Sequence, residues 1–192
     1  AYSSAVIAAD VEELRQVLGY QQFNLYAVSY GTRLALTLMR DYPQTVRSAV
    51  LDSALPLQAS LYTSLAPNAE RAFDVLFERC AADPDCASAH PDLKADFFAL
   101  VDQLNTNPLP VALLGLQQPV LLDGGLLIDV VFVGLYNPLG IAAMPAMISQ
   151  VSRGDVSILA DRLSLYLDTS TALGQQMAVI CAEEIPFSSP EQ

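Results

Sequence analysis

The first fifty residues alternate between helical and strand-like hydrophobic patterns. A helix is predicted over residues 5–18, ended by Gly19, and a second helix over residues 30–42 is apolar around most of its circumference and should be buried. The apolar face of the first helix is formed by Ile7, Val11, Leu14 and Leu18. The short apolar runs 23–28 and 48–51 suit buried strands. Strand, helix and strand together fit one βαβ unit, which predicts two parallel strands with a right-handed crossover.

The rest of the chain is predicted to be mostly helical. Helices are expected over residues 66–80, 92–105, 124–136, 139–152 and 155–167. The inward-facing positions of the first two are Ala69, Ala72, Phe73, Leu76, Phe77, Leu93, Phe97, Leu100, Val101 and Leu104. Residues 108–122 are rich in Val, Leu and Gly and suggest a small hairpin. Asp123 suits the cap of the helix that follows, and the apolar stripe of that helix is Leu126, Val130 and Val133.

This order of elements predicts an α/β fold with an added helical part. We expect a partial α/β core over residues 1–57, a mostly helical lid over residues 58–178 and a return segment over residues 179–192. Two short parallel strands do not make a stable open sheet alone, because both faces and both edges need neighbours. The rest of a larger core, or another copy of the chain, is therefore expected to cover the strand edges.

Composition excludes several classes of protein. Of the 192 residues, 53% are hydrophobic and 16% are charged, which suits a sizeable core and argues against disorder. The net charge is −12, and the nine Lys and Arg residues form no cluster, which argues against binding to nucleic acids or anionic membranes. No apolar run reaches the roughly 18 residues of a transmembrane helix. The first residues also lack the pattern of a signal peptide.

The three cysteines bear on the cellular compartment. Cys80 and Cys86 enclose a short loop with the turn-forming Pro84, and we expect a disulfide between them, which indicates an oxidising compartment. Two buried free thiols in a cytosolic protein are the alternative. A zinc site is disfavoured, because such sites need about four ligands and the only histidine is His90. Cys181 is either buried and free or paired outside the chain.

Ser29 is the clearest candidate for chemistry. It lies between the first predicted strand and the next helix, with Ala27 two residues before it and Gly31 two residues after. This arrangement is typical of a nucleophile elbow, a sharp strand-to-helix turn that presents a serine oxygen to a substrate. Small flanking residues let the helix pass close to the strand, although Gly is the usual residue where Ala27 stands. An ordinary loop serine is the alternative.

Several stretches of the chain resemble a known family. They are Ala9–Tyr20, Asn24–Ala35, Arg40–Pro43, Val46–Ser53 and Cys181–Phe187. They look like the α/β-hydrolase fold and, more narrowly, like the tripeptidyl-aminopeptidase-like branch of the prolyl aminopeptidase family. In that fold a helical insertion after the strand that follows the nucleophile helix forms a lid, and the order of elements predicted here agrees.

The resemblance implies a secreted or extracytoplasmic serine peptidase that removes residues from peptide N-termini and uses no cofactor or metal. Ser29 would be the nucleophile, and the backbone N–H of Tyr30, at the positive end of a helix, would supply half of the oxyanion hole. Glu183 and Glu184 would hold the free amino group of the substrate, because an ammonium in a dry site needs an anionic partner. A solvated pair or a helix start is the alternative for these two glutamates.

Other catalytic parts of this family are not among these residues. The second oxyanion donor would come from a Gly-rich loop before residue 1, and the catalytic Asp and His would follow the glutamate pair. We therefore expect an interior piece of a larger hydrolase, inactive alone, because a serine without a histidine base is a poor nucleophile. His90 is expected at the lid surface, Asp52 in a structural hydrogen bond, and Arg33 in a salt bridge that anchors the helix after Ser29.

Two other functions stay open. An esterase or lipase of the same fold would act on a small ester or amide and would need no amine-binding acids such as Glu183 and Glu184. A non-catalytic helical interaction module, with the βαβ part as an adaptor, is favoured by the missing histidine if the 192 residues are the whole natural protein.

Overall fold

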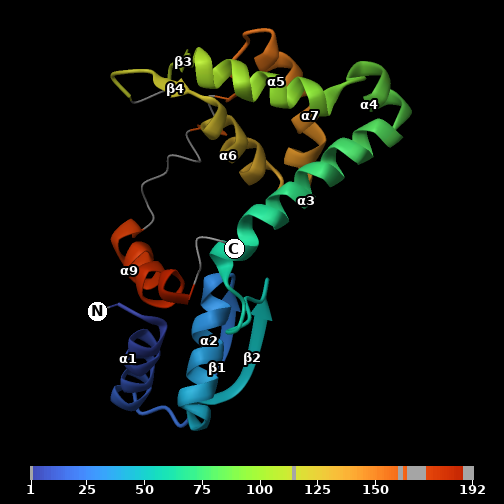
Figure 1. Ribbon diagram of the computed structural model, residues 1–192. Helices are drawn as coiled ribbons and strands as arrows, with labels where there is room; N and C mark the ends of the chain where they lie inside the picture. The colour runs from blue at the N-terminus through green and yellow to red at the C-terminus, as the bar shows by residue number, and fades with distance from the viewer. Residues whose placement is uncertain (1, 114–115, 160–161, 164–171, 188–192) are drawn as a thin grey trace. The chain divides into compact units, whose positions relative to one another are not determined.

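The computed structural model describes residues 2–113, 116–159, 162–163 and 172–187. The chain divides into two compact units, drawn as ribbons in Figure 1. The first unit comprises residues 1–66 and 172–192 and contains Ser29. The second comprises residues 67–171 and is mostly helical. The first unit is therefore assembled from both the beginning and the end of the chain.

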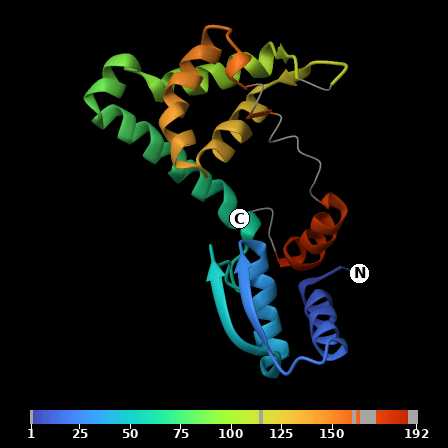
Figure 2. The same cartoon turned by 180° about the vertical axis from the view of Figure 1, so that it is seen from behind.

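A parallel βαβ motif forms the base of the first unit. The motif consists of β1 (Phe23–Val28), α2 (Tyr30–Asp41) and β2 (Val46–Asp52), with the 3₁₀ turn η1 (Pro43–Thr45) before β2. The other elements of the unit are α1 (Ser4–Val17), α9 (Leu173–Glu183) and the 3₁₀ turn η3 (Ile185–Phe187). The two strands pair in parallel, with Val28 opposite Asp52. Figures 1 and 2 show α2 lying along the strands between them and α1. The predicted parallel βαβ unit is thus confirmed, and it places Ser29 where β1 ends. The prediction that its strands are buried was wrong, because every residue of β1 and β2 is half-buried or exposed.

The buried face of α1 is not its apolar face. Its buried residues are Ser4, Ala8 and Glu12, whereas Leu14 and Leu18 are 52% and 54% exposed. The helix packs against α2, and the two buried polar residues are accommodated because each has hydrogen-bond partners. Polar contacts therefore help to decide which side of α1 is buried, and of the predicted apolar stripe Ile7 and Val11 are half-buried while Leu14 and Leu18 are exposed.

Glu12 connects α1 to η1, the turn that precedes β2. Its carboxylate accepts hydrogen bonds from the Arg15 guanidinium at 2.7 and 2.9 Å, from the Gln16 amide at 2.8 Å and from the Thr45 hydroxyl. The bonds from Arg15 above all, and then those from Thr45 and Gln16, hold the pKa of Glu12 well below its ordinary value. The folded chain thus binds a proton at Glu12 more weakly than the unfolded chain does.

This shift predicts a loss of stability in acid. The contribution of Glu12 is complete above its unfolded pKa of about 4.3 and declines as the pH falls below that value. In urea denaturation between pH 6 and pH 3, Glu12→Gln should lose part of the pH dependence of the unfolding free energy. The matched variant Glu13→Gln, which changes an exposed neighbour, should keep the wild-type dependence. Equal slopes for wild type and Glu12→Gln would contradict this account of Glu12.

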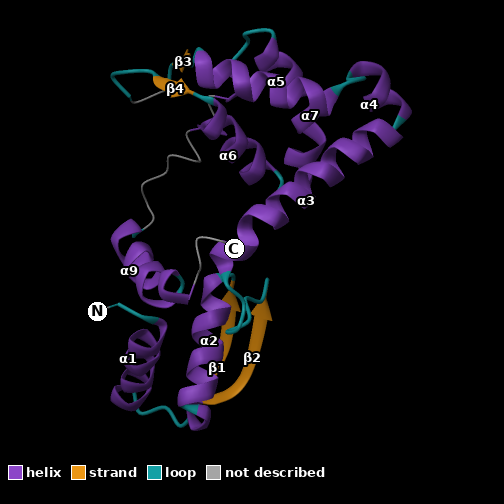
Figure 3. Cartoon of the chain, viewed as in Figure 1, coloured by secondary structure: helices purple, strands orange, loops and turns teal. Residues whose placement is uncertain are grey.

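The second unit packs its helices around one apolar core. Its elements are α3 (Leu61–Ala82), which begins in the first unit, α4 (Pro84–Ala89), α5 (Leu93–Thr106), β3 (Leu109–Val111), β4 (Val120–Leu122), α6 (Gly124–Gly134), α7 (Pro138–Ser152) and the 3₁₀ turn η2 (Ser157–Leu159). Figure 3 shows the short antiparallel pair β3–β4 among the helices, which confirms the predicted hairpin. All five inward positions predicted for α5 are buried. Stacked rings of Phe73, Phe77 and Phe97 join α3 to α5.

Some details of the second unit extend or change the predictions. α3 begins at Leu61 and contains Pro67, although its pattern predicted a start at residue 66. Asp123 caps α6 as predicted, accepting a hydrogen bond from the Leu126 N–H at 2.8 Å. Where a helix was expected over residues 155–167, the structure has η2 and helical residues 162–163. Residues 160–161 and 164–167 of that expected helix lie outside the described residues.

The cysteines differ in their bonding. Cys80, at the end of α3, and Cys86 of α4 are joined by a disulfide, with their Cα atoms 5.1 Å apart. Cys181 is exposed on α9 and carries a free thiol. Among the described helices, none is long and apolar enough to cross a membrane.

Candidate active site

Ser29 adopts a backbone conformation that is unusual for a residue other than glycine. Its φ of 53° and ψ of −123° lie in the left-handed half of the Ramachandran map, which costs about 1–3 kcal/mol. Three hydrogen bonds hold this conformation: the Ser29 N–H donates to the carbonyl of Asp52 at 3.1 Å, and the Ser29 carbonyl accepts from the Thr32 N–H at 2.9 Å and the Thr32 hydroxyl at 2.7 Å. The side chain is exposed. A strained serine between a strand and a helix has the geometry of a nucleophile elbow.

Thr32 is a structural part of this turn that the sequence did not single out. Its side chain is fully buried, and besides donating to Ser29 its hydroxyl accepts a hydrogen bond from the Leu55 N–H at 2.8 Å. One hydroxyl thus joins the elbow to the loop that follows β2. The sequence feature that could have identified this role is a threonine three residues after the candidate nucleophile.

The small residues around Ser29 fit the close approach of strand and helix. A methyl group built on Gly31 would lie 3.8 Å from the Cβ of Ala27, which is ordinary van der Waals contact. The methyl group of Ala27, where Gly is usual, therefore fits beside the start of α2.

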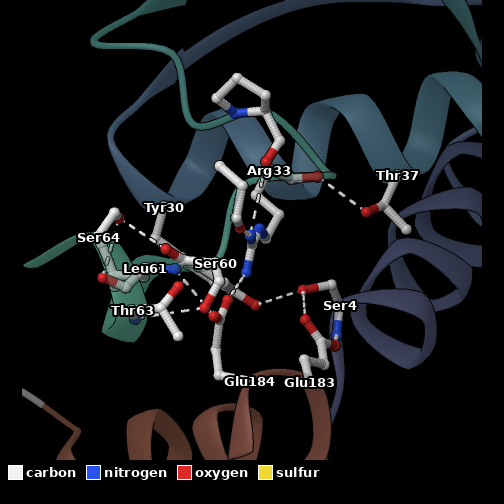
Figure 4. Close-up of polar contacts among 12 residues, drawn as sticks. Ser4, Tyr30, Arg33, Thr37, Ser60, Leu61, Thr63, Ser64, Glu183 and Glu184 are labelled. Atoms are coloured by element: carbon white, nitrogen blue, oxygen red, sulfur yellow. Dashed lines mark hydrogen bonds and ion pairs between the residues drawn. The ribbon is translucent and has the colours of Figure 1, made fainter. Parts of the chain in front are cut away.

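Tyr30 begins α2, so its backbone N–H belongs to the first turn of the helix, where the macrodipole is positive. Its phenol oxygen lies 2.9 Å from the Ser4 hydroxyl, which in turn donates to Glu183 at 2.7 Å. Since the single Ser4 proton is committed to Glu183, the Tyr30 hydroxyl is the donor to Ser4. Figure 4 shows these contacts among Tyr30, Ser4 and Glu183.

Glu183 is the last residue of α9 and contacts the start of α1. Its carboxylate accepts hydrogen bonds from both the N–H and the hydroxyl of Ser4. It thereby places a negative charge at the positive end of α1. The side chain is half-buried. Its bonds to Ser4 link the end of α9 to Tyr30.

Glu184 forms a buried ion pair with Arg33 of α2. Its other carboxylate oxygen accepts a hydrogen bond from the Leu61 N–H at 2.9 Å. Arg33 also donates to the backbone carbonyl of Ala59 and, at 3.5 Å, to that of Pro56. The salt bridge predicted for Arg33 is confirmed, and Figure 4 shows Glu184 as its partner.

A pocket of about 470 Å³ lies in the first unit along α2 and the end of α9. The charged side chains that line it are Arg33, Arg40, Glu183 and Glu184. Ser29 does not line it. The contacts from Glu183 through Ser4 to Tyr30 connect the rim of this pocket to the elbow.

The model of the alpha/beta hydrolase fold family matches residues 1–110, more than half of the chain. The chain belongs to the alpha/beta hydrolase fold family. Similar curated proteins include "Serine protease Hip1" of Mycobacterium tuberculosis and of Mycobacterium bovis, each 30% identical over 105 residues, or 51% of this chain and 20% of the relative. "Putative hydrolase YuaR" of Escherichia coli is 29% identical over 107 residues, or 52% of this chain and 21% of the relative. The chain therefore spans about a fifth of the length of these relatives.

In alpha/beta hydrolases an acid and then a histidine follow the serine along the chain. His90 belongs to the second unit, where its Nδ1 lies 2.6 Å from the Ser149 hydroxyl. Asp52 belongs to the first unit, and its carboxylate accepts from the Ser53 hydroxyl at 3.2 Å and the Tyr26 hydroxyl at 3.4 Å. Within the described residues, no hydrogen bond joins the Ser29 hydroxyl to either side chain, and no group of His, Cys, Asp or Glu could hold a metal.

Proposed function

We propose that the full-length protein is a serine hydrolase with Ser29 as its nucleophile. The supporting observation is the left-handed backbone of Ser29 between β1 and α2, held by Asp52 and Thr32. The Ser29 oxygen attacks the carbonyl carbon of the substrate, and a base from another part of the protein takes its proton and passes it to the leaving group, so that an acyl-enzyme forms. Water then attacks the acyl-enzyme, which releases the acid and restores the serine hydroxyl. The N–H of Tyr30, at the positive end of α2, stabilises the oxyanion.

The substrate class that we favour is a peptide with a free N-terminus, so that the enzyme is an aminopeptidase. Glu183 is the acid that we assign to the substrate ammonium: it is half-buried at the pocket, and each carboxylate oxygen has two lone pairs, which leaves capacity beside the Ser4 bonds. Glu184 compensates the buried charge of Arg33, so its role in our proposal is to hold that side chain. The relatives named as serine proteases support a peptidase over an esterase.

This assignment predicts a selective effect of Glu183→Gln in the full-length protein. Loss of a charge-assisted hydrogen bond, about 1.5–3 kcal/mol, should lower kcat/KM for a peptidyl anilide with a free N-terminus by about 10- to 150-fold. Hydrolysis of a small nitrophenyl ester should stay within about threefold, because no ammonium is bound in that reaction. The matched control is Glu13→Gln, an exposed acid on α1.

The same assay separates the peptidase from an esterase of this family. An aminopeptidase should cleave the free peptide anilide and leave its N-acetylated form intact. Equal cleavage of both forms by the wild type, with no effect of Glu183→Gln, would contradict the aminopeptidase and favour the esterase.

The proposal also includes further core elements that cover β1 and β2. Tyr26, Val28 and Val50 of the two strands are 71%, 47% and 59% exposed, and sheets of so few strands need further strands or helices packed against them for stability. We assign the covering of these strands to further core elements of the full-length protein, in keeping with the greater length of its relatives. The disulfide Cys80–Cys86 supports a secreted or extracytoplasmic location.

A further inference from the structure

The ion pair Arg33–Glu184 joins three segments that are distant in sequence. Arg33 belongs to α2, the helix that begins directly after Ser29, and its guanidinium also binds the carbonyls of Pro56 and Ala59. Glu184 follows α9 and also binds the N–H of Leu61, the first residue of α3. Two side chains therefore hold the nucleophile helix, the start of α3 and the end of α9 together.

Two of these segments are the connections between the units. α3 starts in the first unit at Leu61 and continues into the second unit from Pro67. After the second unit, the chain re-enters the first unit at Ala172 and passes through α9 to Glu184. The connection that leaves the first unit and the connection that returns to it are thus both bonded to the Arg33–Glu184 pair. Arg33 lies four residues after Ser29.

Stability alone does not account for a buried pair of this kind. The desolvation of two charges offsets most of their attraction, and apolar residues of similar size are often as stable or more so. Arg33 also leaves its buried Nε without a hydrogen-bond partner among the described residues, which adds to the cost of burial. The charged pair forms hydrogen bonds that an apolar pair could not form. Arg33 donates to the carbonyls before α3, and Glu184 accepts from the N–H of Leu61.

We infer that Arg33 and Glu184 are positioning residues for catalysis, which set the outgoing and returning connections against α2, the helix that begins directly after Ser29. This role rests on the proposed hydrolase function and adds to it. The pair does not contact the reacting atoms. It determines how well the chain that leaves and re-enters the first unit is placed to bind an extended substrate.

The test compares two variants of the full-length protein with the wild type. Glu184→Gln removes the charge but keeps the shape, and the double variant Arg33→Met/Glu184→Met replaces the pair with apolar side chains. Both should raise KM for a peptidyl anilide by at least about tenfold, because small misplacements away from the chemistry weaken substrate positioning. The kcat and the rate of Ser29 labelling by a small fluorophosphonate should change by less than about threefold, because the elbow itself is intact. Glu13→Gln is again the control.

The double variant distinguishes positioning from simple stabilisation. If the pair only stabilises the fold, KM in the apolar variant will follow its urea midpoint, and a variant with a midpoint close to that of the wild type will have a wild-type KM. A restored KM, or a KM that Glu184→Gln leaves unchanged, would overturn the positioning role. If the wild type itself is not labelled at Ser29, the proposed function fails instead, so the two failures are distinguishable.

Discussion

Replacing Ser29 with alanine in the full-length protein should abolish hydrolysis, lowering kcat by at least about 10⁴-fold, since removal of a serine nucleophile from other hydrolases costs this much or more. The reason is that the oxyanion donors that remain cannot replace a covalent step. Substrate binding should be kept, because the backbone of the elbow is held by the main chain of Asp52 and by Thr32 and not by the Ser29 hydroxyl.

Ser53 offers a matched control for this substitution. It too has a positive φ, of 56°, it is exposed, and it follows the strand that pairs with β1. Ser53→Ala should keep kcat within about threefold, since surface changes of this kind have small effects. The measurement is steady-state hydrolysis of a nitrophenyl ester and of a peptidyl anilide. A Ser29→Ala protein that keeps most of its kcat would show that the elbow does not carry the nucleophile.

Arg33→Ala should strongly destabilise the first unit. It leaves the buried carboxylate of Glu184 without its cation, and breaking a buried pair in this way costs about 3–5 kcal/mol. The control is Arg40→Ala on the same helix, whose side chain is 57% exposed and pairs with Asp41. That change should cost at most about 1 kcal/mol.

Urea denaturation of the wild type, Arg33→Ala and Arg40→Ala measures these differences in stability through the unfolding midpoint. Adding Glu184→Met to an Arg33→Met protein should recover most of the lost stability, because both charges are then removed together. Equal midpoints for Arg33→Ala and Arg40→Ala would contradict the buried ion pair seen in the structure.

The local elements were predictable because their patterns are local. A strand, a turn with Ser29 and a helix lie within twenty residues, and the apolar spacing of Leu93, Phe97 and Leu104 fixes the inner face of α5. Hydrophobic periodicity failed for α1, because it ranks residues by polarity and does not see that Glu12 is satisfied by Arg15 and Thr45. A buried polar residue with enough partners can take the place of an apolar one.

The site was predictable only in part, because its contacts are long-range. The sequence suggested a salt bridge for Arg33, but its partner lies 151 residues further along the chain. Ser4 and Thr32 were not singled out, since hydroxyls carry no distinctive pattern and gain their roles only when the chain brings Glu183 and Leu55 beside them. The adjacent glutamates looked equivalent in sequence, yet one is buried against Arg33 and the other binds the start of α1.

The most direct test of the central claim is covalent labelling of the full-length protein with a fluorophosphonate, followed by peptide mass spectrometry. The account predicts one phosphonylated serine, Ser29, and no labelled protein in the Ser29→Ala variant, whereas Ser53→Ala labels like the wild type. A label found on another serine, or one that persists in Ser29→Ala, would contradict the assignment of Ser29 as the nucleophile.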